Sequence, residues 1–228
     1  MSRSLYISRL LATGESLTRR VQRALPFRRA LAPEFAESAR SVVFPPNGTT
    51  DPDTPEYRDL AARGFADWQL EVRGLVERPS RFSLADLRRL PSRTQITRHD
   101  CVEGWSAIAK WTGVPLGAIL DRVGVLPRAR YVVLHCADTM DESGDEPYYE
   151  SVDLEDAVHP QTILAYDMND RPVPVAHGAP LRLRVERQLG YKMAKYVMAV
   201  ELVETFARIE GGRGGYWEDR GYEWYAGI

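Results

Sequence analysis

Short runs of strand-forming residues, separated by turn residues and by capped helical patterns, recur through most of the chain. Val, Ile, Leu and Tyr are frequent in these runs, which cover residues 68–74, 131–136, 163–168, 181–185 and 196–203. The helical patterns predict short helices at 55–63, 84–90 and 116–123. Elements of both kinds in this irregular order favour a mixed, β-rich α+β domain.

The N-terminal residues follow a different pattern. The first 40 residues hold eight Arg against three Glu, and apolar residues recur at helical spacing between residues 5 and 25. This pattern predicts an amphipathic helix that packs on the domain as an arm; the less favoured alternative is a helix on a membrane surface. Because 228 residues suffice for one large domain with its own core, we expect a helical arm at 1–43 and one domain at 44–228.

Composition excludes several classes of protein. A formal net charge of -2 gives no overall attraction for nucleic acid, and two cysteines exclude a disulfide framework. The chain has no run of about 18 apolar residues, so no membrane span is expected. Arg19-Arg20 and Arg28-Arg29 resemble export signals, but neither pair is followed by the apolar segment that such a signal requires, so we expect none in this chain.

Two stretches have a biased composition. Residues 138–156 contain nine acidic residues and no basic one, which is typical of a solvated loop and edge strand; a docking face is the alternative. Residues 211–225 are rich in glycine and contain five aromatic residues. Because a flexible tail rarely holds so many aromatic side chains, we expect this segment to pack as a structured tail.

Familiar catalytic motifs are absent from the sequence. It has no Gly-x-Gly-x-x-Gly dinucleotide motif, no Walker loop, no His-Glu-x-x-His and no Gly-x-Ser-x-Gly. The four histidines are too scattered along the chain to propose a zinc site. Two clusters of reactive residue types remain.

The first cluster surrounds Cys101, in the sequence Arg-His-Asp-Cys-Val-Glu-Gly-Trp. Two interpretations of this cysteine stay open from the residues alone. Arg98 and His99 would lower the pKa of a neighbouring thiol and give a reactive thiolate. Alternatively, Cys101 is a small buried apolar residue.

The second cluster spans residues 177–195 and is basic. Alternation along a strand puts Arg182 and Arg184 on one face, and Lys195 arrives from the next segment. Convergent guanidinium and ammonium groups beside a glycine turn suit a phosphate, because they form charge-assisted hydrogen bonds with it. A basic strand face in solvent is the alternative.

Together the two clusters resemble the sulfite oxidase-like family of molybdopterin-dependent oxidoreductases, and most nearly its bacterial branch of periplasmic methionine-sulfoxide reductase catalytic subunits. Cys-Val-Glu-Gly-Trp-Ser, followed by Trp-Thr-Gly-Val-Pro-Leu, is similar to the molybdenum-ligating segment of that family. His-Gly-Ala-Pro-Leu-Arg-Leu and Gly-Tyr-Lys-x-x-Lys are similar to its pterin-phosphate segment. The resemblance covers about residues 68–205 and implies a sulfite-oxidase-like molybdopterin-binding fold.

The resemblance also implies roles for individual residues. Cys101 matches the cysteine whose thiolate ligates molybdenum, with Glu103 and Arg98 flanking it and tuning it. The implied cofactor is Mo-molybdopterin without a nucleotide, held by Asn47, Cys101, Cys136, His177, Arg182, Met193, Ala194 and Lys195. Arg184 is expected to contact this cofactor or to line the substrate mouth. The chain departs from the family pattern in having Cys136 for Thr, His177 for Asn, and Lys110 and Glu186 for Pro.

The implied function is two-electron oxygen-atom transfer at a mononuclear Mo centre, with reduction of a small S- or N-oxide as the favoured reaction. The alternatives are oxidation of sulfite or another small oxyanion, a non-catalytic molybdopterin-binding module, and a cysteine-nucleophile enzyme without a metal. The length leaves no room for a haem domain, so we expect a separate redox partner, either a cytochrome or a membrane haem subunit. The family resemblance implies the periplasm; the cytoplasm is the alternative.

Overall fold

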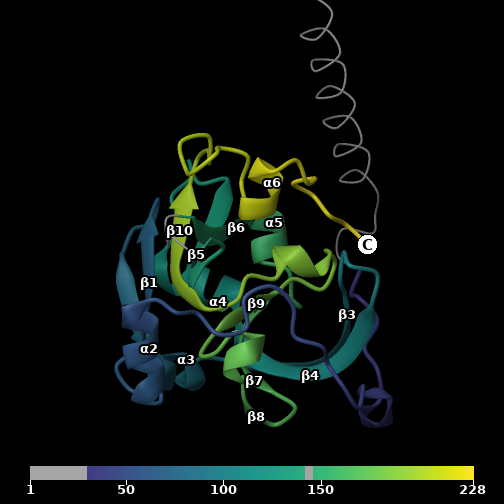
Figure 1. The fold of residues 1–228 in the computed structure, drawn as a ribbon. Helices are drawn as coiled ribbons and strands as arrows, with labels where there is room; N and C mark the ends of the chain where they lie inside the picture. Colours follow the sequence, from purple (N-terminus) through teal and green to yellow (C-terminus); the bar gives the residue numbers. More distant parts are fainter. Residues whose placement is uncertain (1–29, 142–145) are drawn as a thin grey trace, which may run out of the picture. The chain divides into compact units, whose positions relative to one another are not determined.

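The strands of this protein form two five-stranded sheets, seen in a computed structural model that describes residues 30–141 and 146–228 (Figure 1). Ala32–Ile228 form one compact unit. The amphipathic helix expected at 5–25 lies outside the described residues, and a domain boundary at residue 43 stays a prediction. None of the described helices is long and apolar enough to span a membrane.

The first sheet is mixed, and its central strand comes last in the sequence. Its spatial order is β2-β1-β10-β5-β6, in which β1 and β10 pair in parallel and the other neighbours are antiparallel. Its strands are β1(Gln69–Gly74), β2(Ser80–Ser83), β5(Tyr131–Thr139), β6(Pro147–Asp153) and β10(Val197–Val203).

The second sheet is antiparallel and has the order β3-β4-β7-β8, with β9 also paired to β7. Its strands are β3(Arg93–Asp100), β4(Ser106–Pro115), β7(Ile163–Met168), β8(Arg171–Pro172) and β9(Arg182–Arg184). Apolar side chains from both sheets and from several helices, above all α4(Leu116–Val123), meet in one main core. The mixed, strand-rich fold confirms the predicted fold class.

The helices begin and end where local chemistry predicts. Ser83 caps α3(Leu84–Arg89) in a reciprocal capping box with Asp86, and a proline opens α2(Pro55–Ala62). Gly124, at φ +72°, ends α4. The remaining helices are short: α5(Leu154–Ala157), α6(Tyr216–Asp219), η2(Glu37–Ala39), η3(Val175–His177) and η4(Gly190–Lys192).

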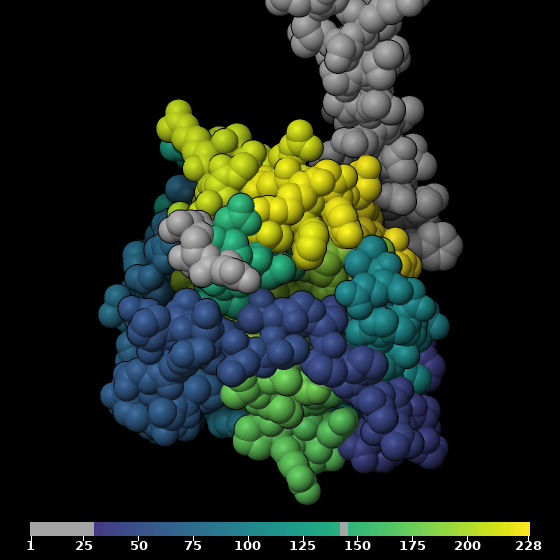
Figure 2. All heavy atoms as spheres, in the orientation of Figure 1, coloured from purple at the N-terminus to yellow at the C-terminus, as the bar shows by residue number. Residues whose placement is uncertain are grey.

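The acidic stretch differs from its expected solvated state. Its strand β6 is an edge strand, as predicted, but Glu150 and Ser151 are fully buried. The reason is the C-terminal segment, which bridges to Glu150 through Gly215 and packs over this part of the domain (Figure 2, yellow). The expectation of a structured aromatic tail is confirmed, because Tyr216 is buried and packs with Val133 and Tyr149.

Candidate active site

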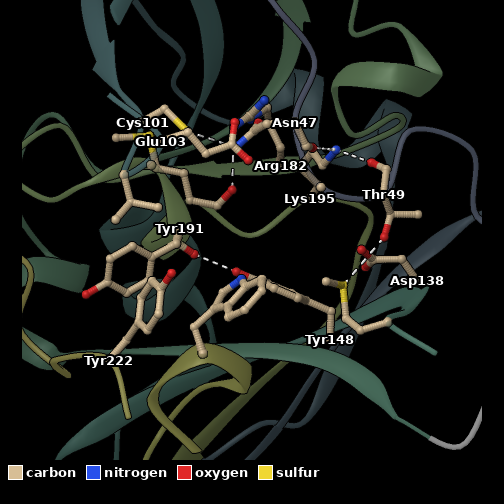
Figure 3. Close-up of a pocket in the computed structure, with 16 residues that line it drawn as sticks. Asn47, Thr49, Cys101, Glu103, Asp138, Tyr148, Arg182, Tyr191, Lys195 and Tyr222 are labelled. Atoms are coloured by element: carbon tan, nitrogen blue, oxygen red, sulfur yellow. Dashed lines mark hydrogen bonds between the residues drawn. The ribbon is translucent and has the colours of Figure 1, made fainter. Parts of the chain in front are cut away.

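A pocket opens where five separate segments of the chain meet (Figure 3). It is lined by the loop at 47–49, the turn after β3, the facing ends of the paired strands β5 and β6, the segment from β9 to Lys195, and the C-terminal segment. Six of the predicted site residues line it: Asn47, Cys101, Glu103, Arg182, Met193 and Lys195. The other described lining residues are Gly48, Thr49, Val102, Asp138, Met140, Tyr148, Gly190, Tyr191, Trp217 and Tyr222.

Cys101 is held in the tight turn between β3 and β4. Its N–H donates to the oxygen of Trp105 at 2.9 Å, and Gly104, at φ +90°, donates back to the oxygen of Cys101 at 3.0 Å. Asn47 Nδ2 lies 3.5 Å from the Cys101 sulfur. The backbone therefore fixes a buried, free thiol in the wall of the pocket.

The interpretation in which Arg98 and His99 lower the pKa of the Cys101 thiol is wrong. Burial raises the pKa of the Cys101 thiol, and the Glu103 carboxylate adds to this effect. Arg98 is 56% exposed and ion-paired with Asp100 at 2.9 Å, so its charge is compensated by that carboxylate. Burial also holds the pKa of His99 well below its usual range, which leaves that ring neutral.

Two cations line the pocket, the buried Arg182 and the half-buried Lys195, and neither forms an ion pair with a carboxylate of the described residues. Arg182 is 2% exposed; it donates to the backbone oxygens of His177 and Met193, and its Nε has no hydrogen-bond partner among the described residues. Burial and the nearby Arg184 lower the pKa of Arg182 to about 9. The alternative of a solvated basic strand is therefore wrong, because these arginines lie inside the protein.

Lys195 is the second cation. Its ammonium donates to the backbone oxygens of Asn47, Thr49 and Ala176, which engages all three of its hydrogens. Burial and the charge of Arg182 lower the pKa of Lys195 to about 8. Lys195 thus fixes the loop that carries Asn47, and an anion beside Arg182 would relieve the repulsion between the two cations.

Asp138 is a lining residue that the sequence analysis did not single out. It is 3% exposed, its Oδ1 has no hydrogen-bond partner among the described residues, and burial raises its pKa to about 6. Nothing in the sequence distinguishes it from the other eight acids of the stretch 138–156. The sequence analysis also missed Tyr148, Trp217 and Tyr222. It expected their segments, 138–156 and 211–225, to have a structural role and no part in the site.

Some predicted site residues are not among the described residues that line the pocket: Arg98, Cys136, His177 and Ala194. Cys136 packs against the main core from β5. His177 packs edge-on against Phe44 at 5.5 Å, and burial lowers its pKa to about 4, so it carries no positive charge at neutral pH. Arg184 is also absent from the lining; it is fully buried and paired with Glu186 at 2.6 Å.

These features fit a particular kind of ligand. Two cations away from bulk solvent suit an anionic group, and a buried carboxylate with one oxygen free of hydrogen bonds suits a group with N–H donors. A free thiol in the same pocket suits a metal that binds sulfur. A metal-bearing pterin with a terminal phosphate combines these three properties.

Residues 57–208 match a family described as the oxidoreductase molybdopterin binding domain. The chain belongs to this family. It is 41% identical over 197 residues to "Putative protein-methionine-sulfoxide reductase subunit YedZ1" of Azospira oryzae, covering 86% of this chain and 68% of that protein. It is 38% identical over 148 residues to "Protein-methionine-sulfoxide reductase catalytic subunit MsrP" of Xanthomonas campestris, covering 61% of this chain and 46% of that protein.

A solved structure shares the fold. The sulfane dehydrogenase SoxCD from Paracoccus pantotrophus aligns with a TM-score of 0.55 and 25% identity, over 61% of this chain and 39% of that chain. The family and this structure confirm the predicted fold, cofactor and enzyme class. The chain is a molybdopterin-dependent oxidoreductase.

Proposed function

We propose that this protein reduces an organic S-oxide at a mononuclear Mo centre ligated by Cys101. The observation that carries the proposal is a buried free thiol in the same pocket as two cations, Arg182 and Lys195, and a buried carboxylate, Asp138, whose Oδ1 has no hydrogen-bond partner among the described residues. The reaction consumes two electrons and two protons, breaks the S–O bond, and yields a sulfide and water. The names of the two relatives, both methionine-sulfoxide reductase subunits, support reduction over oxidation.

Each lining residue has a proposed task. When bound, the Mo-molybdopterin would supply the metal that accepts the oxygen atom and carries the two electrons. Arg182 would hold its phosphate, with the nearby positive charge of Lys195 adding to the attraction, and Asp138 would accept hydrogen bonds from its pterin ring. Asn47 donates toward the Cys101 sulfur and would tune the basicity of the thiolate, as a ligand's hydrogen-bond partner does at other metal sites. Glu103 lies beside the same sulfur.

The electrons would come from a separate protein, either a cytochrome or a membrane haem subunit. The names of the relatives support this arrangement, because they describe subunits. By the same likeness we propose the periplasm as the compartment.

The proposed function is tested with purified, cofactor-loaded protein. We expect about one Mo and one pterin per chain, by elemental analysis and by fluorescence of the released, oxidised pterin. We expect reduced viologen to be oxidised in the presence of methyl phenyl sulfoxide, and no reduction of ferricyanide by sulfite. Sulfite oxidation without sulfoxide reduction would contradict the proposed reduction reaction. A fully matured preparation without Mo or pterin would contradict the proposed Mo-dependent activity.

Arg182→Ala is expected to lower the Mo and pterin content per chain. Loss of one charge-assisted hydrogen bond costs about 1.5–3 kcal/mol, so retention should weaken roughly ten- to a hundred-fold. Arg182→Lys should also lose cofactor, because an ammonium lacks the planar two-point contact of a guanidinium. Metal content after prolonged dialysis measures the effect.

Arg88→Ala is the matched control for this experiment. Arg88, in α3, is also an arginine, but it forms a surface ion pair with Asp167 of β7, at 2.6 Å. Its variant should keep the cofactor content of the wild type. Full retention of cofactor by Arg182→Ala would mean that another group anchors the phosphate.

A further inference from the structure

The pocket is completed by residues that follow the family domain. The family match ends at residue 208, yet Trp217 and Tyr222 line the pocket together with Tyr191. The Tyr222 ring packs against both neighbours: its centroid is 5.2 Å from that of Tyr191, at an interplanar angle of 88°, and 5.3 Å from that of Trp217, at 31°. We call these three side chains the aromatic wall.

The aromatic wall lies at the Cys101 end of the pocket. In Figure 3, Tyr191 and Tyr222 lie on the same side of the pocket as Cys101 and Glu103, whereas Asp138 is at the other end. The backbone agrees, because Gly190, which precedes Tyr191, packs against the residues just before Cys101: an added Cβ would clash with the His99 ring and lie 3.3 Å from the oxygen of Asp100. The aromatic wall therefore faces the reacting end of the pocket rather than the end assigned to the pterin.

Buried polar contacts hold the aromatic wall in place. Lys192 follows Tyr191 and forms ion pairs with Glu150 of β6 and with Glu218, which follows Trp217; all three side chains are at most 1% exposed. The Tyr191 hydroxyl donates to the oxygen of Glu223 at 2.7 Å, beside Tyr222. The wall is thus a preorganised surface, which lowers the cost of ordering it when a ligand binds.

The mouth of the pocket is apolar at this end. Val102 and Tyr222 line the pocket and are also 47% and 40% exposed, so both reach from the pocket to solvent. Glu103, which belongs to the same turn as Cys101, also lines the pocket beside Val102. Aromatic faces and a carboxylate favour a neutral organic group that contains sulfur and disfavour a small dianion.

We infer that Trp217 and Tyr222 bind the organic group of the substrate and determine specificity for an organic sulfoxide over an inorganic sulfur oxyanion. This inference rests on the proposed function and adds to it the residues that recognise the substrate. The sulfide or sulfoxide sulfur would lie at the edge of the aromatic rings, the arrangement that sulfur–aromatic contacts favour.

The test compares Tyr222→Leu and Trp217→Leu with Tyr225→Leu in cofactor-loaded protein. Tyr225 is the matched control, because it is a tyrosine of the same segment that is not among the described residues lining the pocket. Each wall variant should raise the KM for methyl phenyl sulfoxide about tenfold, as expected for loss of one aromatic contact, with kcat and Mo content nearly unchanged. Tyr225→Leu should keep the wild-type KM.

Two further measurements distinguish recognition from general structural damage. Tyr222→Phe should restore the wild-type KM, since the ring and not the hydroxyl makes the proposed contact. Calorimetric binding of the product, methyl phenyl sulfide, should weaken in parallel with KM, independently of turnover. The inference is overturned if KM and sulfide binding are unchanged in both wall variants, or if these variants lose Mo instead. A wild-type protein that reduces no sulfoxide would overturn the proposed function itself.

Discussion

Cys101→Ser is expected to abolish sulfoxide reduction and to change the Mo(V) paramagnetic spectrum while leaving the fold intact. The proposed metal ligand is a polarizable thiolate, and a serine oxygen does not reproduce its bonding to a soft centre. Turnover should fall by roughly a thousand-fold or more, the scale seen when a group essential to a catalytic unit is removed. The fold should survive, because the turn at Cys101 is held by backbone hydrogen bonds.

Cys136→Ser is the matched control for that variant. Cys136 is the other cysteine of the chain, but it lies on β5 against the main core and outside the described lining of the pocket. We expect its turnover and Mo(V) spectrum to stay close to those of the wild type. A wild-type spectrum in Cys101→Ser, or a Cys101–Cys136 disulfide found by mass spectrometry in active protein, would contradict the assignment.

Arg184→Met is expected to produce the largest loss of stability of any variant discussed. Arg184 donates two hydrogen bonds to the Glu186 carboxylate, from Nε at 2.8 Å and from Nη2 at 2.6 Å, and both side chains are fully buried. Its third nitrogen contacts His99 Nδ1 at 3.0 Å, and its guanidinium lies 4.6 Å from the ring centroid of Trp111. Removing the cation leaves a buried carboxylate uncompensated, which costs about 3–5 kcal/mol of unfolding free energy.

Thermal and denaturant unfolding measure this effect. For a domain of this size the loss corresponds to a fall in Tm of roughly 6–20 °C. Arg184→Met with Glu186→Leu should recover much of the stability, because a buried ion pair is often replaceable by apolar residues. Arg88→Met, which breaks a surface pair, should cost less than about 1 kcal/mol. A single Arg184 variant as stable as the wild type would show that Glu186 is neutralised in another way.

The helices and most strands were predictable because their determinants are local. The Ser83 cap, the Pro55 start and the Gly124 end are each read within a few residues. Strand β3 was not predicted, because the side chains that it buries are polar: Gln95, Thr97 and His99. An inward face made of polar residues has no apolar alternation, so the period that identifies a strand is missing.

The candidate site was predictable where a motif carries it and not where three-dimensional contact creates it. The two basic residues Arg182 and Arg184 share a face as predicted, since both pack on Trp111. Their depths differ, however: one lines the pocket and the other pairs with Glu186. Spacing gives the face of a strand but not what packs against it. Asp138 and Trp217 were missed for the same reason, because only tertiary packing brings them into the pocket that contains Cys101.

The position of β10 also bears on the order in which this protein is built. β10 is the central strand of its sheet, pairing in parallel with β1 and antiparallel with β5, yet residues 197–203 are synthesised after every other strand. Until they emerge from the ribosome, β1 and β5 lack the partner that joins them, and contacts between residues so distant in sequence form slowly. Lys195, which secures the Asn47 loop, arrives just before β10. We therefore expect the cofactor to be loaded after this region has been translated, because only then can the pocket form.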